Sequence, residues 1–257
     1  MNDNTATVID LASRTVRATL PTGVGPHEVA ASESGQWAVV TNYGVRGKPG
    51  NTLTVIDLAT ATVERTIDLG EYQRPHGVTF FAGDSLLAVT SETSKVVLLV
   101  EFATGRVVGT VPTERPASHM LALATNVGDG SVTAINPKTR ATGAVTPVAR
   151  LVEGIAITPD GRTAIITDPA KAEIRIIDVP SRKERLRVSV PADSILATAE
   201  FPGSPSPEGV AAGTNGFAYI TLQGRNQAAG IDLSTGKIVW RLPVGAWPDG
   251  VAYARAR

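Results

Sequence analysis

The three histidines of this chain occupy the same place in a short phrase that returns along the sequence. The phrase begins with proline in most copies and usually ends in glycine and valine, as at 75–78 and 207–210. Its second residue in the six copies is His27, His76, His119, Glu153, Glu208 and Asp249. Imidazole nitrogens are good ligands for zinc, copper or iron, and three of them leave a coordination position open. We therefore predict that the histidines bind one divalent transition metal, with a carboxylate of this set as a further ligand or a base.

A plainer interpretation of these residues competes with the metal site. Repeats copy their residues together, so equivalent histidines need not share a task, and the position can be a polar turn. A carboxylate in each of the other copies is an unusual choice for a neutral turn, which favours a functional site. The sequence assigns no catalytic residue.

A second phrase, Val-Ile-Asp or a close variant, alternates with the first at a period of about 40 residues, which indicates one repeated structural unit. It ends at Asp10, Asp57, Glu101, Asn136, Asp178 and Asp232. Between the phrases lie short runs of β-branched residues bounded by Gly, Asn, Asp and Pro, which is typical of strands and turns. In the copy that begins at His27, the predicted strands are 27–32, 37–42, 52–58 and 62–69. We predict an all-β fold, a β-propeller with six blades of mostly four antiparallel strands.

The two ends of the chain are predicted to complete one blade together. Its first strand would be 249–253 and its last two strands 6–10 and 15–20, so that N- and C-terminal strands close the ring. The third blade is also short, because His119 and Asn136 are closer in sequence than the equivalent residues of other repeats. We expect three strands in each of these two blades, within a single propeller domain that spans 1–257.

The predicted second strands of four blades have similar sequences, namely VVTN at 39–42, AVTS at 88–91, IITD at 165–168 and YITL at 219–222. With the Val-Ile-Asp phrase that follows, they resemble the YVTN-family β-propeller repeat over nearly the whole chain. The resemblance implies a binding or scaffold function toward a protein, a glycan or a small molecule, and a periplasmic or extracellular location. The chain starts inside a repeat with no signal peptide, so an export signal would belong to a segment that precedes it.

Composition argues against several other classes. The chain has no cysteine, so disulfides and thiolate sites are excluded. Lys and Arg number 24, as do Asp and Glu, which removes the electrostatic argument for a nucleic-acid partner. No apolar run reaches the roughly 20 residues of a membrane span. The basic run 182–187 is interpreted as a charged outer strand that resists edge pairing. We expect a monomer.

Two functions are left by this reasoning. The first is a binding or scaffold protein with a ligand or metal site at the mouth of the central channel. The second is a metal-dependent enzyme, an oxidoreductase or a hydrolase, that uses the histidines and carboxylates. The insertion 191–206 is predicted to be a lid, a binding segment or a plain surface insertion, and Trp247 lies where it could line a pocket.

Overall fold

The computed structural model describes residues 2–112, 123–126, 131–135, 142–147, 153–193, 196 and 201–255. In these residues the regular structure consists of β-strands and one short 3-10 helix, η1 (Gln223–Arg225). The chain divides into two compact units. Unit 1 contains Met1–Met120 and Ala254–Arg257, and unit 2 contains Leu121–Tyr253.

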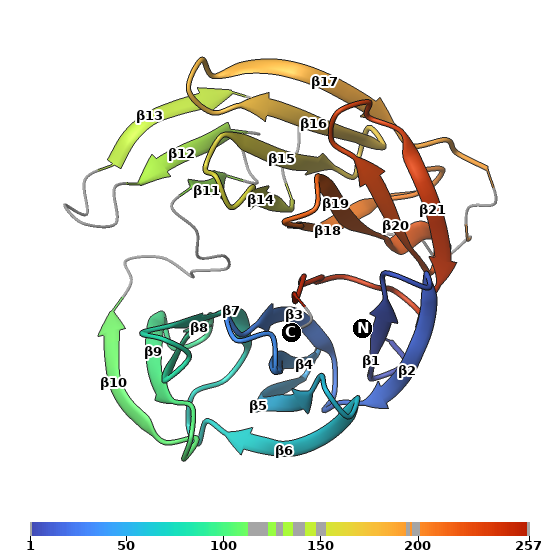
Figure 1. The fold of residues 1–257 in the computed structure, drawn as a ribbon. Helices are drawn as coiled ribbons and strands as arrows, with labels where there is room; N and C mark the ends of the chain where they lie inside the picture. The colour runs from blue at the N-terminus through green and yellow to red at the C-terminus, as the bar shows by residue number, and fades with distance from the viewer. Residues whose placement is uncertain are drawn as a thin grey trace. The chain divides into compact units, whose positions relative to one another are not determined.

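The described strands of unit 1 form three antiparallel sheets (Figure 1). The first sheet pairs β1 (Thr5–Asp10) with β2 (Thr15–Pro21). The second sheet is a meander of β3 (Pro26–Ala31), β4 (Trp37–Val45), β5 (Lys48–Asp57) and β6 (Thr62–Asp68). The third sheet is a meander of β7 (Pro75–Phe81), β8 (Leu86–Ser91), β9 (Val96–Glu101) and β10 (Val107–Pro112). β3 and β7, the first strands of the two meanders, contact each other.

The described strands of unit 2 also form three antiparallel sheets. One has three strands, β11 (Leu123–Asn126), β12 (Ser131–Ile135) and β13 (Thr142–Pro147). The next is a meander of β14 (Ile155–Ile157), β15 (Thr163–Asp168), β16 (Glu173–Asp178) and β17 (Lys183–Ser189). The last is a meander of β18 (Pro207–Ala212), β19 (Phe217–Leu222), β20 (Gln227–Asp232) and β21 (Ile238–Pro243).

The core of each unit lies between neighbouring meanders. In unit 1, Leu53 of the second sheet packs in one buried cluster with Leu87 and Leu98 of the third. In unit 2, Ile176 of β16 shares a cluster with Ile231 of β20. Branched and β-branched side chains fit the pleated surface of a sheet, and burying one stabilises the fold by about 1.5–3 kcal/mol. A meander thus buries its apolar faces against the next meander of its unit.

Arginines of the outer strands add polar ties between neighbouring sheets. Each donates from its guanidinium to a backbone carbonyl of the next sheet, and the pairs are Arg17 to Leu58, Arg65 to Phe102 and Arg185 to Leu233. Arg185 belongs to the basic run 182–187, which lies along the outer strand β17 as predicted. In the same run, Arg187 donates to Glu184 at 2.9 Å. The basic run therefore has structural partners.

The prediction of six blades is wrong. Four sheets have the full four strands of a blade, whereas the sheets β1-β2 and β11-β12-β13 have two and three described strands. The sequence phrases mark one strand each and do not report whether the rest of a sheet is present. The predicted closure is also not found, because residues 249–253 form no strand and β1 pairs only with β2 among the described strands. Over the residues that the structure describes, the fold is all-β and propeller-like, with four four-stranded blades.

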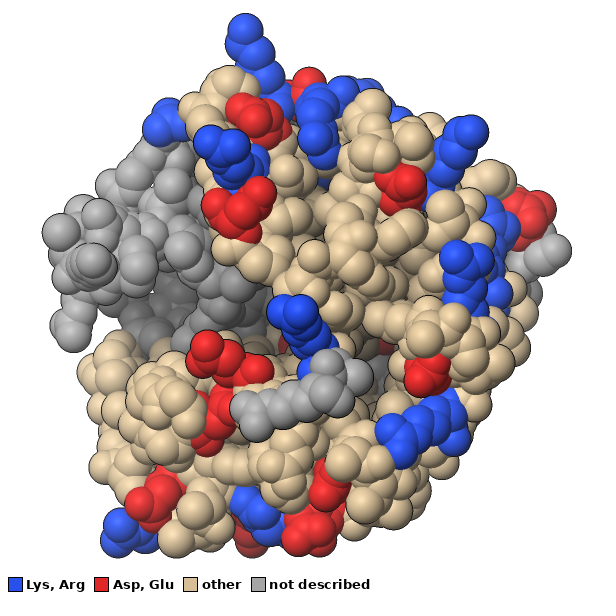
Figure 2. Space-filling model, viewed as in Figure 1, with Lys and Arg blue, Asp and Glu red and all other residues tan. Residues whose placement is uncertain are grey.

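The described surface carries charges of both signs. Figure 2 shows Lys and Arg side chains interspersed with Asp and Glu over the visible face, in line with the balanced composition. Among the described residues, no helix has the length and apolar character needed to cross a membrane.

Candidate functional site

A residue in the left-handed backbone conformation precedes the proline in four copies of the histidine-or-acid phrase. These residues are Gly25, Arg74, Ser206 and Trp247, with φ of 63°, 53°, 50° and 55°. The backbone N–H of each of these residues donates a hydrogen bond. The pairs are Gly25 N to Asn4 Oδ1, Arg74 N to Gly50 O, Ser206 N to Ser204 Oγ and Trp247 N to Asn226 Oδ1. A residue other than glycine in this conformation costs about 1–2 kcal/mol, and such strain concentrates at functional sites. The same turn therefore precedes each of these four phrases.

A β-bulge follows this turn in three of the copies. The register of β3 against β4 shifts between Pro26 and Val29, and the equivalent shifts lie between Pro75 and Val78 and between Pro207 and Val210. A bulge leaves residues unpaired and redirects their side chains. The residues released from the ladder include His27, His76 and Glu208, which are the residues singled out in the sequence.

The threonine side chain of the VVTN-like strands forms hydrogen bonds to the backbone of the phrases. Thr41 Oγ1 accepts a hydrogen bond from Glu28 N at 3.0 Å and donates one to His76 O at 2.9 Å. It thus joins the phrase of its own blade to the phrase of the next blade. The equivalent bonds of unit 2 join Thr167 to Gly154 and Glu208, and Thr221 to Gly209 and Asp249.

The rings of His27 and His76 lie against each other in unit 1. Their centroids are 4.1 Å apart and their planes are inclined by 45°. Tyr43, at the end of β4, packs on both, with its ring centroid 5.1 Å from that of His27 and 5.4 Å from that of His76. His76 is 9% exposed and His27 is half-buried. Two imidazoles of the predicted metal site are therefore neighbours.

Arg74 and Glu92 complete this cluster around Tyr43. The Arg74 guanidinium lies over the Tyr43 ring, 4.7 Å from its centroid, which is a cation–π contact. The Tyr43 hydroxyl donates a hydrogen bond to Glu92 Oε2 at 2.6 Å. Burial raises the pKa of Tyr43 and the hydrogen bond to Glu92 raises it further, whereas Arg74 lowers it. The phenol therefore stays neutral and keeps its place between the two charges.

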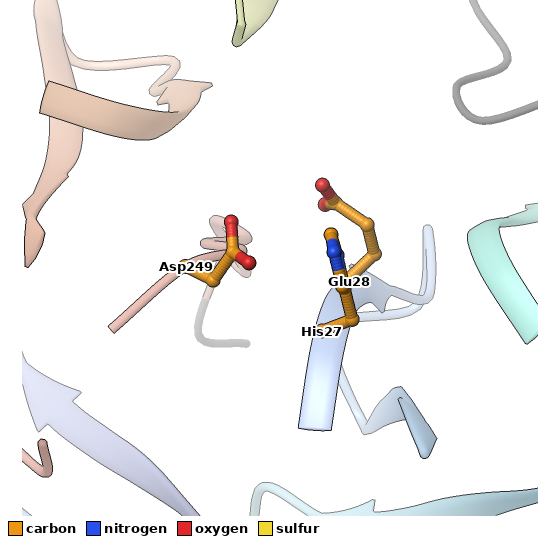
Figure 3. Close-up of side chains that lie close together, drawn as sticks. All are labelled: His27, Glu28 and Asp249. Atoms are coloured by element: carbon orange, nitrogen blue, oxygen red, sulfur yellow. The ribbon is translucent and has the colours of Figure 1, made fainter. Parts of the chain in front are cut away.

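Glu28 brings a carboxylate to the same cluster. A carboxylate oxygen of Glu28 and a ring nitrogen of His27 lie within 4.8 Å of each other. Figure 3 shows both side chains leaving the start of β3 toward the same side. Asp249, which is labelled in the same picture, belongs to unit 2. In unit 1, His27 thus lies close both to the carboxylate of Glu28 and to the ring of His76.

The three predicted carboxylate residues, Glu153, Glu208 and Asp249, lie in unit 2. Glu208 is 3% exposed and accepts a hydrogen bond from Ser206 Oγ at 2.6 Å. The carbonyl of Asp249 lies so close to Gly209 that a Cβ on this glycine would be 2.3 Å from it. Glu153 donates its N–H to Thr167 O at 3.2 Å. At Gly154 and Gly209, the backbone of the next phrase leaves no room for a side chain.

The structure describes five of the six residues of the predicted site. The structure brings His27 and His76 together, and His119 lies outside the described residues. Sequence reasoning missed four members of the unit 1 cluster, namely Glu28, Tyr43, Arg74 and Glu92. Two signals were present: Glu28 replaces the glycine of other copies, and Tyr43 and Glu92 each follow a VVTN-like strand at the same repeat position.

Parts of the insertion 191–206 are held against η1 and the strands of unit 2. Arg225 is 7% exposed and donates to Asp193 Oδ1 at 2.5 Å, and this contact holds the pKa of Asp193 below its usual range. Leu196 N donates to Gly224 O at 2.8 Å, and Ser204 Oγ donates to Pro169 O at 2.5 Å. The described parts of the insertion are therefore anchored at both of its ends.

Comparison with known proteins informs the fold. The chain is similar in structure to Kuenenia stuttgartiensis hydrazine synthase, with a TM-score of 0.59, over 98% of this chain and 84% of that chain. The sequence identity is 14%, so the likeness shows the fold alone. No family model and no curated protein matches the chain. The class defined by these findings is an all-β, propeller-like protein.

Proposed function

We propose that this protein is a binding protein of the YVTN-repeat type that holds a divalent transition metal at the cluster of His27, Glu28 and His76. The propeller-like fold supports a binding or scaffold role, because such folds present many equivalent loop and strand starts to a ligand. The observation that carries the proposal is the contact between the two imidazole rings, which two successive blades bring to one place. Repetition of the backbone thus supplies two equivalent donors.

The donor set fits a borderline metal ion. Two imidazole nitrogens and one carboxylate oxygen suit zinc, copper or iron, and such a set leaves positions open for a ligand. The backbone behind both histidines is fixed by Thr41, so only the side chains need to turn toward an ion. His119 is a further donor in this proposal by its position in the sequence. The YVTN resemblance also leads us to propose an exported location and a protein, glycan or small-molecule partner.

Nothing in the described part of the chain favours the alternative, a metal-dependent oxidoreductase or hydrolase. In this proposal the metal either binds a ligand or links two blades structurally. This assignment makes the metal affinity itself the quantity to measure.

Titration calorimetry with zinc chloride tests the proposal. We expect one zinc ion per chain in the wild-type protein, and an affinity at least about tenfold lower in His76→Ala, because one of few ligands is lost. Glu28→Gln is expected to weaken binding as well, and Glu71→Gln, on an exposed residue of the same unit, is its matched control. An unchanged affinity in a folded His76→Ala protein would refute the site, and so would a wild-type protein that does not bind zinc.

A further inference from the structure

Arg74 stands in a backbone position where glycine would be more stable. Its φ is 53°, in the left-handed region, and the equivalent residue of the preceding blade is Gly25. Glycine adopts this conformation without a steric penalty, whereas arginine does not. Arg14 and Arg182 adopt the same conformation in exposed turns, so the contacts of its side chain, and not the backbone alone, distinguish Arg74.

The guanidinium of Arg74 is held in a defined place. One of its faces lies on the Tyr43 ring, the ring that also contacts His27 and His76. Arginine has five N–H donors in a fixed fork that matches an oxyanion, so Arg74 keeps further donors for a ligand besides its contacts with the ring and hydroxyl of Tyr43. In the described residues, the ion pairs of arginine involve Arg175, Arg187, Arg225 and Arg241 and not Arg74.

We propose that Arg74 is a ligand-binding residue that recognises an oxyanion group, a phosphate or a carboxylate, on the ligand of the histidine cluster. This inference rests on the proposed function in one respect, that the cluster around Tyr43 is the ligand site. Tyr43 positions the guanidinium through its ring, and Glu92 fixes Tyr43 through the hydroxyl. The imidazoles of His27 and His76 pack on the same Tyr43 ring and add ring nitrogens to the cluster, and N–H donors are the groups that oxyanions prefer.

The chain offers a matched control for this idea. Arg14, in the exposed turn after β1, has a φ of 55°. Arg14→Gly and Arg74→Gly thus remove the same side chain and the same charge from the same backbone conformation. Both should relieve left-handed strain, but Arg74→Gly also loses the contact with the Tyr43 ring, so the melting temperatures of the two variants are measured alongside the titrations. Only Arg74 lies in the cluster.

The test is titration calorimetry of metal-free protein with inorganic phosphate and, separately, with acetate. We expect saturable binding of at least one probe, a loss of about tenfold or more in Arg74→Gly, and wild-type binding in Arg14→Gly, since hydrogen bonds to charged groups contribute on this scale. Arg74→Lys keeps the charge but not the fork and should fall between the two; it also serves if Arg74→Gly does not fold. Stronger binding of phosphate would identify a phosphoryl group, and stronger binding of acetate a carboxylate.

The inference is overturned if neither probe saturates the wild-type protein, or if Arg14→Gly loses as much affinity as Arg74→Gly. Because these titrations contain no metal, a protein that binds phosphate through Arg74 but never binds zinc would refute only the metal proposal. A protein that binds zinc through His76 but no oxyanion through Arg74 would refute only the inference.

Discussion

The two units build the same phrase with the same backbone but give its side chains different surroundings. In unit 1, His27 and His76 lie against each other and share the Tyr43 ring with Arg74. In unit 2, Glu208 is almost fully buried and accepts a hydrogen bond from Ser206. The left-handed turn and the threonine bonds are common to both units, so they belong to the fold. The side chains differ, so any difference in ligand binding between the two units must come from them.

The largest effect is expected at the residue that follows the histidine or acid of a phrase, which is Gly209 in unit 2 and Glu28 in the first phrase of unit 1. Gly209→Ala places a Cβ where the Asp249 carbonyl lies 2.3 Å away, so backbone must move, and we expect a loss of about 3 kcal/mol or more in the free energy of unfolding. Glu28→Ala, at the equivalent position of unit 1, already has a Cβ and should cost less than about 1 kcal/mol. Urea denaturation followed by circular dichroism measures both. Equal losses would show that the close approach is not the cause.

Removing the threonine bonds should have a smaller effect that still differs between the units. Thr167→Val leaves a buried N–H and a carbonyl without their partner at 2.7 Å, and we expect a loss of about 2 kcal/mol. Thr41 is as fully buried as Thr167, but its bonds are longer and its partner Glu28 is half-buried, so Thr41→Val should cost about 1 kcal/mol. The same denaturation experiment applies. A larger loss for Thr41→Val would show that the shorter hydrogen bonds of Thr167 do not contribute more to stability than the longer bonds of Thr41.

Much of the fold could be predicted from the sequence, and the reason is local. Runs such as 39–42 and 53–56 fix strands through their β-branched residues, and these strands are confirmed within β4 and β5. The number of complete blades could not be predicted, because the terminal phrase at Asp249 keeps its hydrogen bond to Thr221 without belonging to a strand. The presence of a phrase therefore predicts a local backbone conformation but not that the residues pair in a sheet.

The site was predictable in its repeated part only. His27 and His76 share a repeat position, so the sequence placed them together. Arg74 joins them through a left-handed turn and Tyr43 through the end of β4, and neither conformation is visible in the pattern of apolar residues. Arg74 and Tyr43 meet the histidines through packing between blades, which a local sequence pattern does not predict.

The smallest effect concerns the two tyrosines whose pKa values are raised. Burial raises the pKa of both Tyr43 and Tyr219, but the hydrogen bond to Glu92 raises that of Tyr43 while the bond to Asn215 lowers that of Tyr219. Glu92→Gln should therefore lower the pKa of Tyr43, and Asn215→Ala should raise that of Tyr219. Both shifts can be followed by NMR of ring-labelled tyrosine between pH 8 and pH 12.

The sign of the stability change follows from these directions. A folded phenol that keeps its proton above the usual pKa of about 10 stabilises the fold below that pH, and this contribution is lost as the pH rises through the folded pKa. The loss should be smaller in Tyr43→Phe than in the wild-type protein. Shifts of the same sign in Glu92→Gln and Asn215→Ala would contradict the difference drawn between the two units.

The central claim is that His27, Glu28 and His76 of unit 1 bind a metal ion. X-ray absorption spectroscopy of the zinc-loaded protein tests this claim most directly. We predict a first shell with at least two imidazole nitrogens at about 2.0–2.1 Å and a carboxylate oxygen, and loss of one imidazole in His76→Ala. A shell made only of water oxygens, or an imidazole signal unchanged in His76→Ala, would contradict the claim.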